Sequence, residues 1–193
     1  MGEPEIAAAP AFVSVTADED RLMQLGIELV VAPPTPADAL VELLEVVALA
    51  LASDLRSEKL EKVASSQVAE CLHRMRFSGS VVIAIGPLLM ATVREEFLKH
   101  EDQDVKVLLS FCFCEITRTT MPDVPYTDDV LKDMFYLIVG TFNGLSDVNS
   151  QSFGGIVAML ETLERSRLCV VMLDVGCDDL MIDMLQTFLK VIR

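Results

Sequence analysis

HEDQDVKVLLSFCFCEITRTTMPDVPYTDD, residues 100–129, decides between two kinds of protein. The stretch contains a histidine, two cysteines in C-x-C spacing and many carboxylates, which are residues of metal sites and of nucleophilic catalysis. It also fits a joint between helices, because Asp102 or Asp104 can cap a helix and the prolines of MPDVP, residues 121–125, can end it. One apolar stripe follows helical spacing: Val105, Leu108, Leu109, Cys112 and Ile116.

The two cysteines do not have the spacing of a metal site. Cys112 and Cys114 lie two positions apart on the predicted helix, so their side chains point to nearly opposite sides. A structural zinc site needs two to four residues between its paired cysteines and a second matching pair of ligands, and neither is present. A cysteine nucleophile paired with His100 stays open as an alternative, although no third group stands at a recognisable spacing to orient the histidine. His73 is the only other histidine. We predict no catalytic, cofactor or metal site.

The remaining candidate ligands are aspartates at Asp123, Asp128, Asp129, Asp178, Asp179 and Asp183. No D-x-[DN]-x-[DN]-G calcium loop contains them, and most stand where helices begin, where negative charge suits the helix dipole. FGG, residues 153–155, lacks the lysine and the preceding strand of a phosphate loop. Two pairs have the spacing of ion pairs on solvated helix faces: Glu161 with Arg165, and Glu164 with Arg167.

Composition indicates a folded, acidic, helical chain. With 193 residues, of which 52% are hydrophobic, it can bury one ordinary core, and its Leu, Val, Ala and Met favour helices. Its 30 acidic and 15 basic residues give a net charge of −15. Such a surface repels phosphate backbones and anionic membranes, so we expect no direct nucleic-acid or membrane contact. Five cysteines form no disulfide framework, which favours reduced, mostly buried thiols in an intracellular protein.

The predicted fold class is all-α, with HEAT or armadillo-like repeats forming an α–α superhelix. Residues 1–20 hold five acids and no Lys or Arg, and we expect an acidic mobile tail. Residues 21–193 form the helical-repeat domain, and joints recur every 22–27 residues, near half a HEAT repeat. An irregular bundle is the alternative. The expected helix pairs cover about 36–75, 80–120 and 127–173, with single helices at 80–99 and 152–173, a short helix at 19–31 and a final helix at 178–192.

One uncharged segment requires a membrane test. Residues 77–93, FSGSVVIAIGPLLMATV, reach the lower length limit for spanning a bilayer. Gly86–Pro87 interrupts the segment and Glu95 follows closely, so we expect a buried helix in a soluble protein. A membrane-tethered helical protein is the alternative.

The last predicted helix is apolar on more than one face. From Leu180 to Ile192, nine residues are Leu, Met, Ile, Phe or Val. Because a terminal repeat needs a polar outer surface, we expect a truncated repeat array. The helix is then expected to dock on a missing neighbour, on a partner, or on another copy of the chain. The last of these would be self-association.

Several longer motifs together resemble one family. They are FLKHEDQDVK (97–106), EITR (115–118), PDVPYTDDVLKDMFYLIVGTFNGLSD (122–147), SFG (152–154), AMLETLE (158–164), CVVMLDVGCDDLM (169–181) and, further upstream, LGIELVVAPPTPADALVELLE (25–45). The chain resembles the N-terminal region of the plant cohesin-associated family named for precocious dissociation of sisters. These are long HEAT-repeat proteins of the nucleus and chromatin.

The resemblance implies a nuclear, non-catalytic adaptor. It would bind cohesin-complex proteins, the kleisin and associated factors, and so regulate sister chromatid cohesion in mitosis and DNA repair. Family members usually follow FG with two basic residues, where this chain has Gly155-Ile156, and no binding residue is carried over. Two alternatives stay open: a soluble helical enzyme using Cys112 or Cys114 with His100, or a truncated relic without function.

Overall fold

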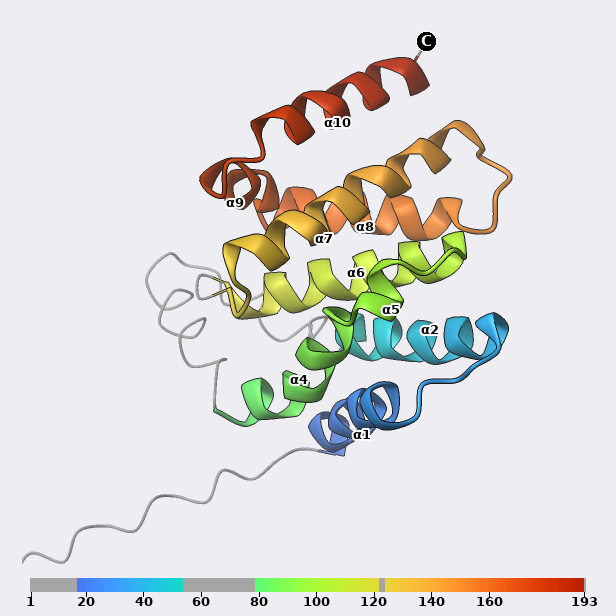
Figure 1. The fold of residues 1–193 in the computed structure, drawn as a ribbon, viewed down its shortest axis with the longest axis vertical. Helices are drawn as coiled ribbons and strands as arrows, with labels where there is room; N and C mark the ends of the chain where they lie inside the picture. Colours follow the sequence, from blue (N-terminus) through green and yellow to red (C-terminus); the bar gives the residue numbers. More distant parts are fainter. Residues whose placement is uncertain (1–16, 54–78, 122–123, 193) are drawn as a thin grey trace, which may run out of the picture.

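The computed structural model describes residues 17–53, 79–121 and 124–192, and no strand occurs in these ranges. Figure 1 shows the helices stacked in successive layers, with α1 and α4 at one end, α6 in the middle and α10 at the other end. This confirms the all-α class. The elements in chain order are α1 (Ala17–Val31), α2 (Ala37–Ser53), α4 (Gly79–Thr92), α5 (Glu95–Leu98), α6 (Gln103–Thr120), α7 (Asp128–Thr141), the 3₁₀ helix η2 (Phe142–Ser146), α8 (Phe153–Arg165), α9 (Leu168–Asp174) and α10 (Asp178–Val191).

Helix boundaries differ from the expectations in three places. Residues 17–20, assigned to the mobile tail, belong to α1. The helix expected at 80–99 is two helices, α4 and α5, and the helix expected at 152–173 is also two, α8 and α9. Residues 1–16 and the second helix of the pair expected at about 36–75 lie outside the described residues.

Arg94 explains the break between α4 and α5. Its backbone is extended, with φ −69° and ψ 133°, and its guanidinium Nη1 donates to the carbonyls of Leu29 at 3.2 Å and Val30 at 2.7 Å. These carbonyls belong to the last turn of α1, which has no basic residue of its own. The arginine therefore caps another helix, and it does so from the residue at which the chain leaves the helical conformation.

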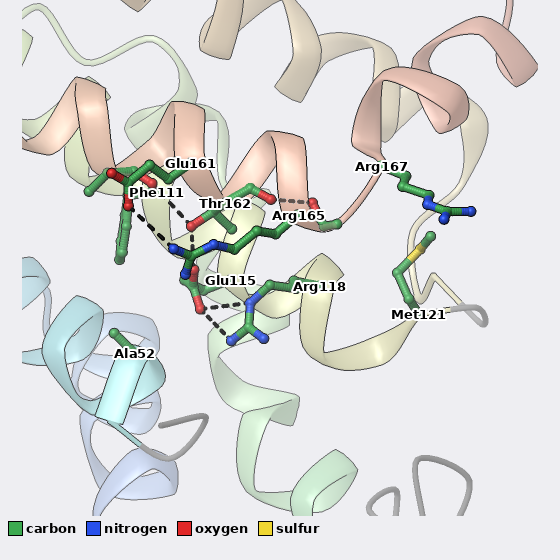
Figure 2. A pocket seen from close by; sticks show the side chains of 11 residues that line it. Ala52, Phe111, Glu115, Arg118, Met121, Glu161, Thr162, Arg165 and Arg167 are labelled. Atoms are coloured by element: carbon green, nitrogen blue, oxygen red, sulfur yellow. Dashed lines mark hydrogen bonds and ion pairs between the residues drawn. The ribbon is translucent and has the colours of Figure 1, made fainter. Parts of the chain in front are cut away.

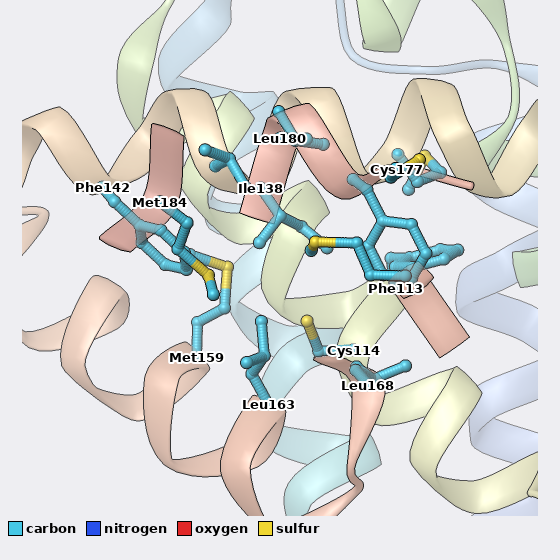
Figure 3. Close-up of a cluster of buried hydrophobic side chains, with 14 of the residues drawn as sticks. Phe113, Cys114, Ile138, Phe142, Met159, Leu163, Leu168, Cys177, Leu180 and Met184 are labelled. Carbon is cyan, nitrogen blue, oxygen red and sulfur yellow. The ribbon is translucent and has the colours of Figure 1, made fainter. Parts of the chain in front are cut away.

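The middle helix, α6, is buried because it contributes to two cores. Val105, Leu109 and Ile116 pack with apolar residues of α1, α2 and α4. Phe113 and Cys114 belong instead to the second core, which α7, η2, α8, α9 and α10 complete, and Figure 3 shows that cluster. This helix therefore lies between neighbouring helices on two sides. Its stripe covers most of the circumference, as expected for the central helix of a layered stack.

The structure selects Asp102 as the cap of α6. One carboxylate oxygen of Asp102 accepts from the backbone N–H of Asp104 at 2.9 Å and of Val105 at 3.2 Å. Asp104 accepts instead from the hydroxyl of Ser152, and so ties the start of α6 to the start of α8. At α7 the N-cap residue is Thr127, but its side chain makes no capping hydrogen bond.

The apolar segment at 77–93 is packed as a helix of the stack over its described part. Ile85, Leu88 and Ala91 of α4 are each about 1% exposed and lie in the core with α1 and α2. In the part of the chain that the structure describes, no helix combines the length and the apolar character needed to cross a bilayer.

Candidate protein-interaction site

The two cysteines of the opening stretch are locked inside the protein. Cys112 is 1% exposed and Cys114 is fully buried, in different cores. Burial raises the pKa of Cys112 to about 12 and raises that of Cys114 further. A catalytic cysteine needs a lowered pKa and access to substrate, so neither thiol has the properties of a nucleophile.

His100 lies in the connection between α5 and α6. Its Nδ1 accepts a hydrogen bond from the backbone N–H of Asp102 at 3.1 Å, which stabilises the turn before α6. The thiol of Cys112 faces elsewhere, toward the carbonyl of Leu44 at 4.0 Å. Within the described ranges the structure gives no contact between His100 and either Cys112 or Cys114, so the arrangement that the enzyme alternative needs is not assembled there.

Four of the six acidic candidates stand in first helical turns. Asp128 and Asp129 begin α7, and Asp178 and Asp179 begin α10, where their charge suits the helix dipole. Asp183 lies in the interior of α10. No group of three or more His, Cys, Asp or Glu that could hold a metal ion occurs in residues 17–53, 79–121 and 124–192. His73 and Asp123 lie outside these ranges.

The FGG motif permits a close approach of two helices. A Cβ on Gly155 would lie 3.1 Å from Cγ1 of Val107, so its absence lets the first turn of α8 lie against α6. This close packing is a structural reason for a glycine at the position. Further along, the Thr162 hydroxyl of α8 donates to the Glu115 carboxylate of α6, so the C-terminal turns of the two helices lie beside one another.

A polar pocket of about 370 Å³ lies where these C-terminal turns meet α2 (Figure 2). Arginines surround it: Arg118 from α6, Arg165 from α8 and Arg167 from the break between α8 and α9. Apolar side chains complete its wall, among them Phe111 and Met121. The pocket thus offers guanidinium groups and apolar surface side by side.

Glu115 organises the base of the pocket. It is 4% exposed, and one of its oxygens accepts from the Thr162 hydroxyl of α8 at 2.6 Å. The other oxygen accepts from Nε of Arg118 at 3.2 Å and from Nη2 at 2.8 Å. A buried carboxylate is stable only when paired and hydrogen-bonded, and these contacts provide both. They also fix Arg118 at the pocket wall.

The outer arginines are held less tightly. Arg165 approaches Glu161 at 3.8 Å, and both side chains are more than 60% exposed; this is the surface pair that the sequence predicts. The pair predicted between Glu164 and Arg167 does not form, because α8 ends at Arg165 and Arg167 adopts a left-handed backbone with φ 54°. Arg167 takes part in no ion pair with the described residues and lines the pocket instead.

The sequence analysis missed this site, although one signal was present. Glu115 and Arg118 are the only charged residues between Lys106 and the MPDVP turn, and a charged pair on so apolar a helix suggests a specific partner. The partner, Thr162, is 47 residues away in the chain, and nothing in the local pattern identifies it.

A second feature is the apolar outer face of α10. Ile182 and Leu185 are each 52% exposed, Leu189 is 61% exposed and Ile192 is 81% exposed. These positions fall at helical spacing on one side of the last helix, whose other side packs through Leu180 and Met184 into the second core. The face has the character of an interaction surface.

Comparison with known proteins places the chain in a family. The family model for "Sister chromatid cohesion protein PDS5 protein" matches residues 62–193. The chain is 42% identical to PDS5 homolog A of Arabidopsis thaliana over 177 residues and 38% identical to homolog C over 175 residues, covering 91% of this chain in each case. Human PDS5 homolog A is 33% identical over 111 residues. The chain spans only 10%, 18% and 8% of these relatives.

A solved structure shares the fold. The helical stack matches a chain in the structure of the Pds5–Scc1 complex with a TM-score of 0.60, covering 77% of this chain and 19% of that one at 21% identity. The helical-repeat architecture is thereby confirmed. Membership of the family rests on the sequence match to the family model. The chain belongs to the PDS5 family of sister chromatid cohesion proteins.

Proposed function

We propose that this chain is a non-catalytic adaptor that binds cohesin-complex proteins and so contributes to the regulation of sister chromatid cohesion. The observation that carries the proposal is the match of residues 62–193 to the PDS5 family model. The fold neighbour comes from a complex of Pds5 with Scc1, which supports the kleisin as the first partner to test. By the same inference the chain acts in the nucleus, on chromatin, in mitosis and in DNA repair.

The geometry supports binding rather than chemistry. The Cys112 and Cys114 thiols are buried with raised pKa values, whereas the arginine pocket and the outer face of α10 are accessible. The enzyme alternative makes a distinct prediction: a hydrolase activity that disappears in a Cys112→Ala, Cys114→Ala variant. Activity that the wild type shows and the variant lacks would favour it over the adaptor.

The direct test is affinity purification from dividing cells. The full chain, tagged and expressed at native level, is recovered from nuclear extract and its bound proteins are identified by mass spectrometry. We expect cohesin subunits, the kleisin among them. A Phe135→Asp variant is the matched control, because Phe135 is fully buried in the second core and the charge should unfold it. Recovery of no cohesin subunit by the wild type would contradict the proposal and favour the relic.

Self-association through α10 stays a prediction, with its own test. Replacing Leu185 and Leu189 by Glu should convert any dimer into a monomer in light scattering coupled to size exclusion. Val148→Glu is the control, because Val148 is an apolar residue of similar exposure, 66%, in the loop after η2. A wild-type chain that is monomeric at high concentration would exclude self-association through this face.

A further inference from the structure

The arginine pocket concentrates positive charge on an acidic protein. The whole chain has 15 Lys and Arg against 30 Asp and Glu, and three of those 15 line one pocket of about 370 Å³. Two carboxylates, Glu115 and Glu161, also line it. A surplus of cations at one place, on a chain with a net charge of −15, is a specific local arrangement and not a consequence of composition.

The helix ends do not use these arginines as caps. Basic residues in a last turn commonly serve the C-terminal carbonyls, but hydroxyl groups do so here. The Thr162 carbonyl accepts from the N–H of Ser166 at 2.9 Å and from its Oγ at 2.6 Å. In α6, the Ile116 carbonyl accepts from the hydroxyl of Thr120 at 3.0 Å. Of these arginines, Arg165 and Arg167 are therefore the two that can pair with a ligand, because Arg118 is already held by Glu115.

The three arginines differ in how firmly they are held. Arg118 is fixed at the pocket wall by Glu115. Arg165 has only the 3.8 Å contact with Glu161, which a ligand carboxylate could replace. The left-handed backbone of Arg167, a conformation that costs a non-glycine residue energy, places its side chain at the opposite end of the pocket, beside Met121 (Figure 2).

Apolar side chains line part of the pocket. Phe111 and Met121 are partly buried, and Ala158 also lines the pocket. A ligand that matches the pocket therefore carries carboxylates that pair with Arg165 and Arg167 and an apolar group that covers Phe111 or Met121. An acidic protein segment with interspersed apolar residues has both properties. Nucleic acid matches poorly, because the remaining surface repels a phosphate backbone.

We propose that this pocket binds an acidic, partly apolar segment of a protein partner, with its carboxylates on Arg165 and Arg167. The inference rests on the proposed adaptor function and specifies the chemistry of one contact. Planar guanidinium groups pair with carboxylates through two parallel hydrogen bonds, so two exposed arginines in one pocket can select for charge and for spacing together.

Binding to a short probe tests the pocket directly. A fluorescein-labelled peptide of alternating glutamate and leucine is titrated with the full chain by fluorescence anisotropy. We expect binding that weakens about tenfold or more in an Arg165→Gln, Arg167→Gln variant, since two charge-assisted pairs are lost. Both side chains are exposed, so the variant should unfold at the wild-type temperature. The matched control, Arg21→Gln with Lys99→Gln, removes the same charge from exposed positions elsewhere.

The control separates a site from general attraction. Equal weakening in both double variants, or none in either, would overturn the proposal. A peptide with glutamine in place of glutamate should bind as weakly as the pocket variant. Tight binding of phosphatidylserine vesicles or of a single-stranded oligonucleotide, lost in the pocket variant, would overturn the assignment to a protein segment.

Affinity purification with the same variants separates this inference from the adaptor function. If the wild type recovers cohesin subunits and the pocket variant recovers fewer, the pocket is one of the contacts. If both recover them equally, the pocket inference fails and the adaptor function stands. If the wild type recovers none while the peptide still binds through Arg165 and Arg167, the adaptor function fails and the chemistry of the pocket stands.

Discussion

The carboxylate of Glu115 should determine how firmly α6 and α8 are joined. Replacing it with alanine removes the 2.6 Å bond from Thr162 and both bonds from Arg118. Breaking a buried ion pair commonly costs about 3–5 kcal/mol. The loss should be smaller here, about 2–3 kcal/mol, because the Arg118 side chain is 27% exposed and can turn to water. The Thr162 hydroxyl also retains the Ala158 carbonyl at 3.1 Å.

Two further variants divide this loss between the Thr162 bond and the Arg118 pair. Glu115→Gln keeps the shape and an acceptor for Thr162, but it loses the charge, and its amide nitrogen cannot accept from Arg118. It should therefore cost about 1–2 kcal/mol. Glu161→Ala removes an exposed carboxylate from the same pocket, whose partner Arg165 lies at 3.8 Å. It should change the unfolding free energy by less than about 0.5 kcal/mol.

Urea unfolding followed by circular dichroism measures all three free energies. The expected order of loss is Glu115→Ala, then Glu115→Gln, then Glu161→Ala. Equal losses for the two alanine variants would refute the reasoning, because they would mean that the buried network contributes no more than a surface charge. A Glu115→Gln variant as unstable as Glu115→Ala would show instead that the bond to Thr162 contributes little.

Three other predictions follow from the same structure. Gly26→Ala should destabilise the fold by about 1–2 kcal/mol, because the new Cβ would lie 2.8 Å from the backbone nitrogen of Leu88. A Cβ at Gly86 would meet nothing within 4 Å, so Gly86→Ala should stabilise α4 by up to about 1 kcal/mol. Thermal unfolding of the two variants compares these effects. Asp102→Ala should cost about 1 kcal/mol in urea unfolding and Thr127→Ala only a few tenths, since only Asp102 makes capping bonds. The pKa of buried Cys112, raised to about 12, means that the folded chain keeps a proton that the unfolded chain loses. The unfolding free energy should therefore fall as pH rises from about 9 to 12, and fall less steeply in Cys112→Ala.

The helical spacing of apolar residues predicted α6, which has neighbouring helices on two sides. Val105, Leu109 and Ile116 recur with the helical repeat and are all buried, as are Phe113 and Cys114 on the opposite side. Solvent is excluded from most of both faces, and among the apolar residues of this helix only Leu108 and Phe111 are partly exposed. The all-α class and the family resemblance both follow from such stretches.

The helix breaks were missed because their causes are tertiary or depend on unusual residues. Arg94 interrupts α4 and α5 to reach the carbonyls of Leu29 and Val30, more than 60 residues away in the sequence. The break after α8 occurs at Ser166 and Arg167, without a glycine or proline to mark it. Left-handed arginine is uncommon, so a sequence pattern favours continuing the helix there.

The buried carboxylate of Glu115 has a role at the pocket, because it holds Arg118 in place. Apolar residues in place of Glu115 and Thr162 could join α6 to α8 at least as stably, since a buried ion pair seldom exceeds a well-packed apolar contact in net stability. They could not hold the guanidinium of Arg118 at the pocket wall through two hydrogen bonds. The same helix thus binds its neighbours through its apolar faces and, at its last turns, positions charge beside Phe111 for a partner. Because the Cys112 and Cys114 thiols are buried in the core, that exposed end of the helix pair is where selective recognition can occur.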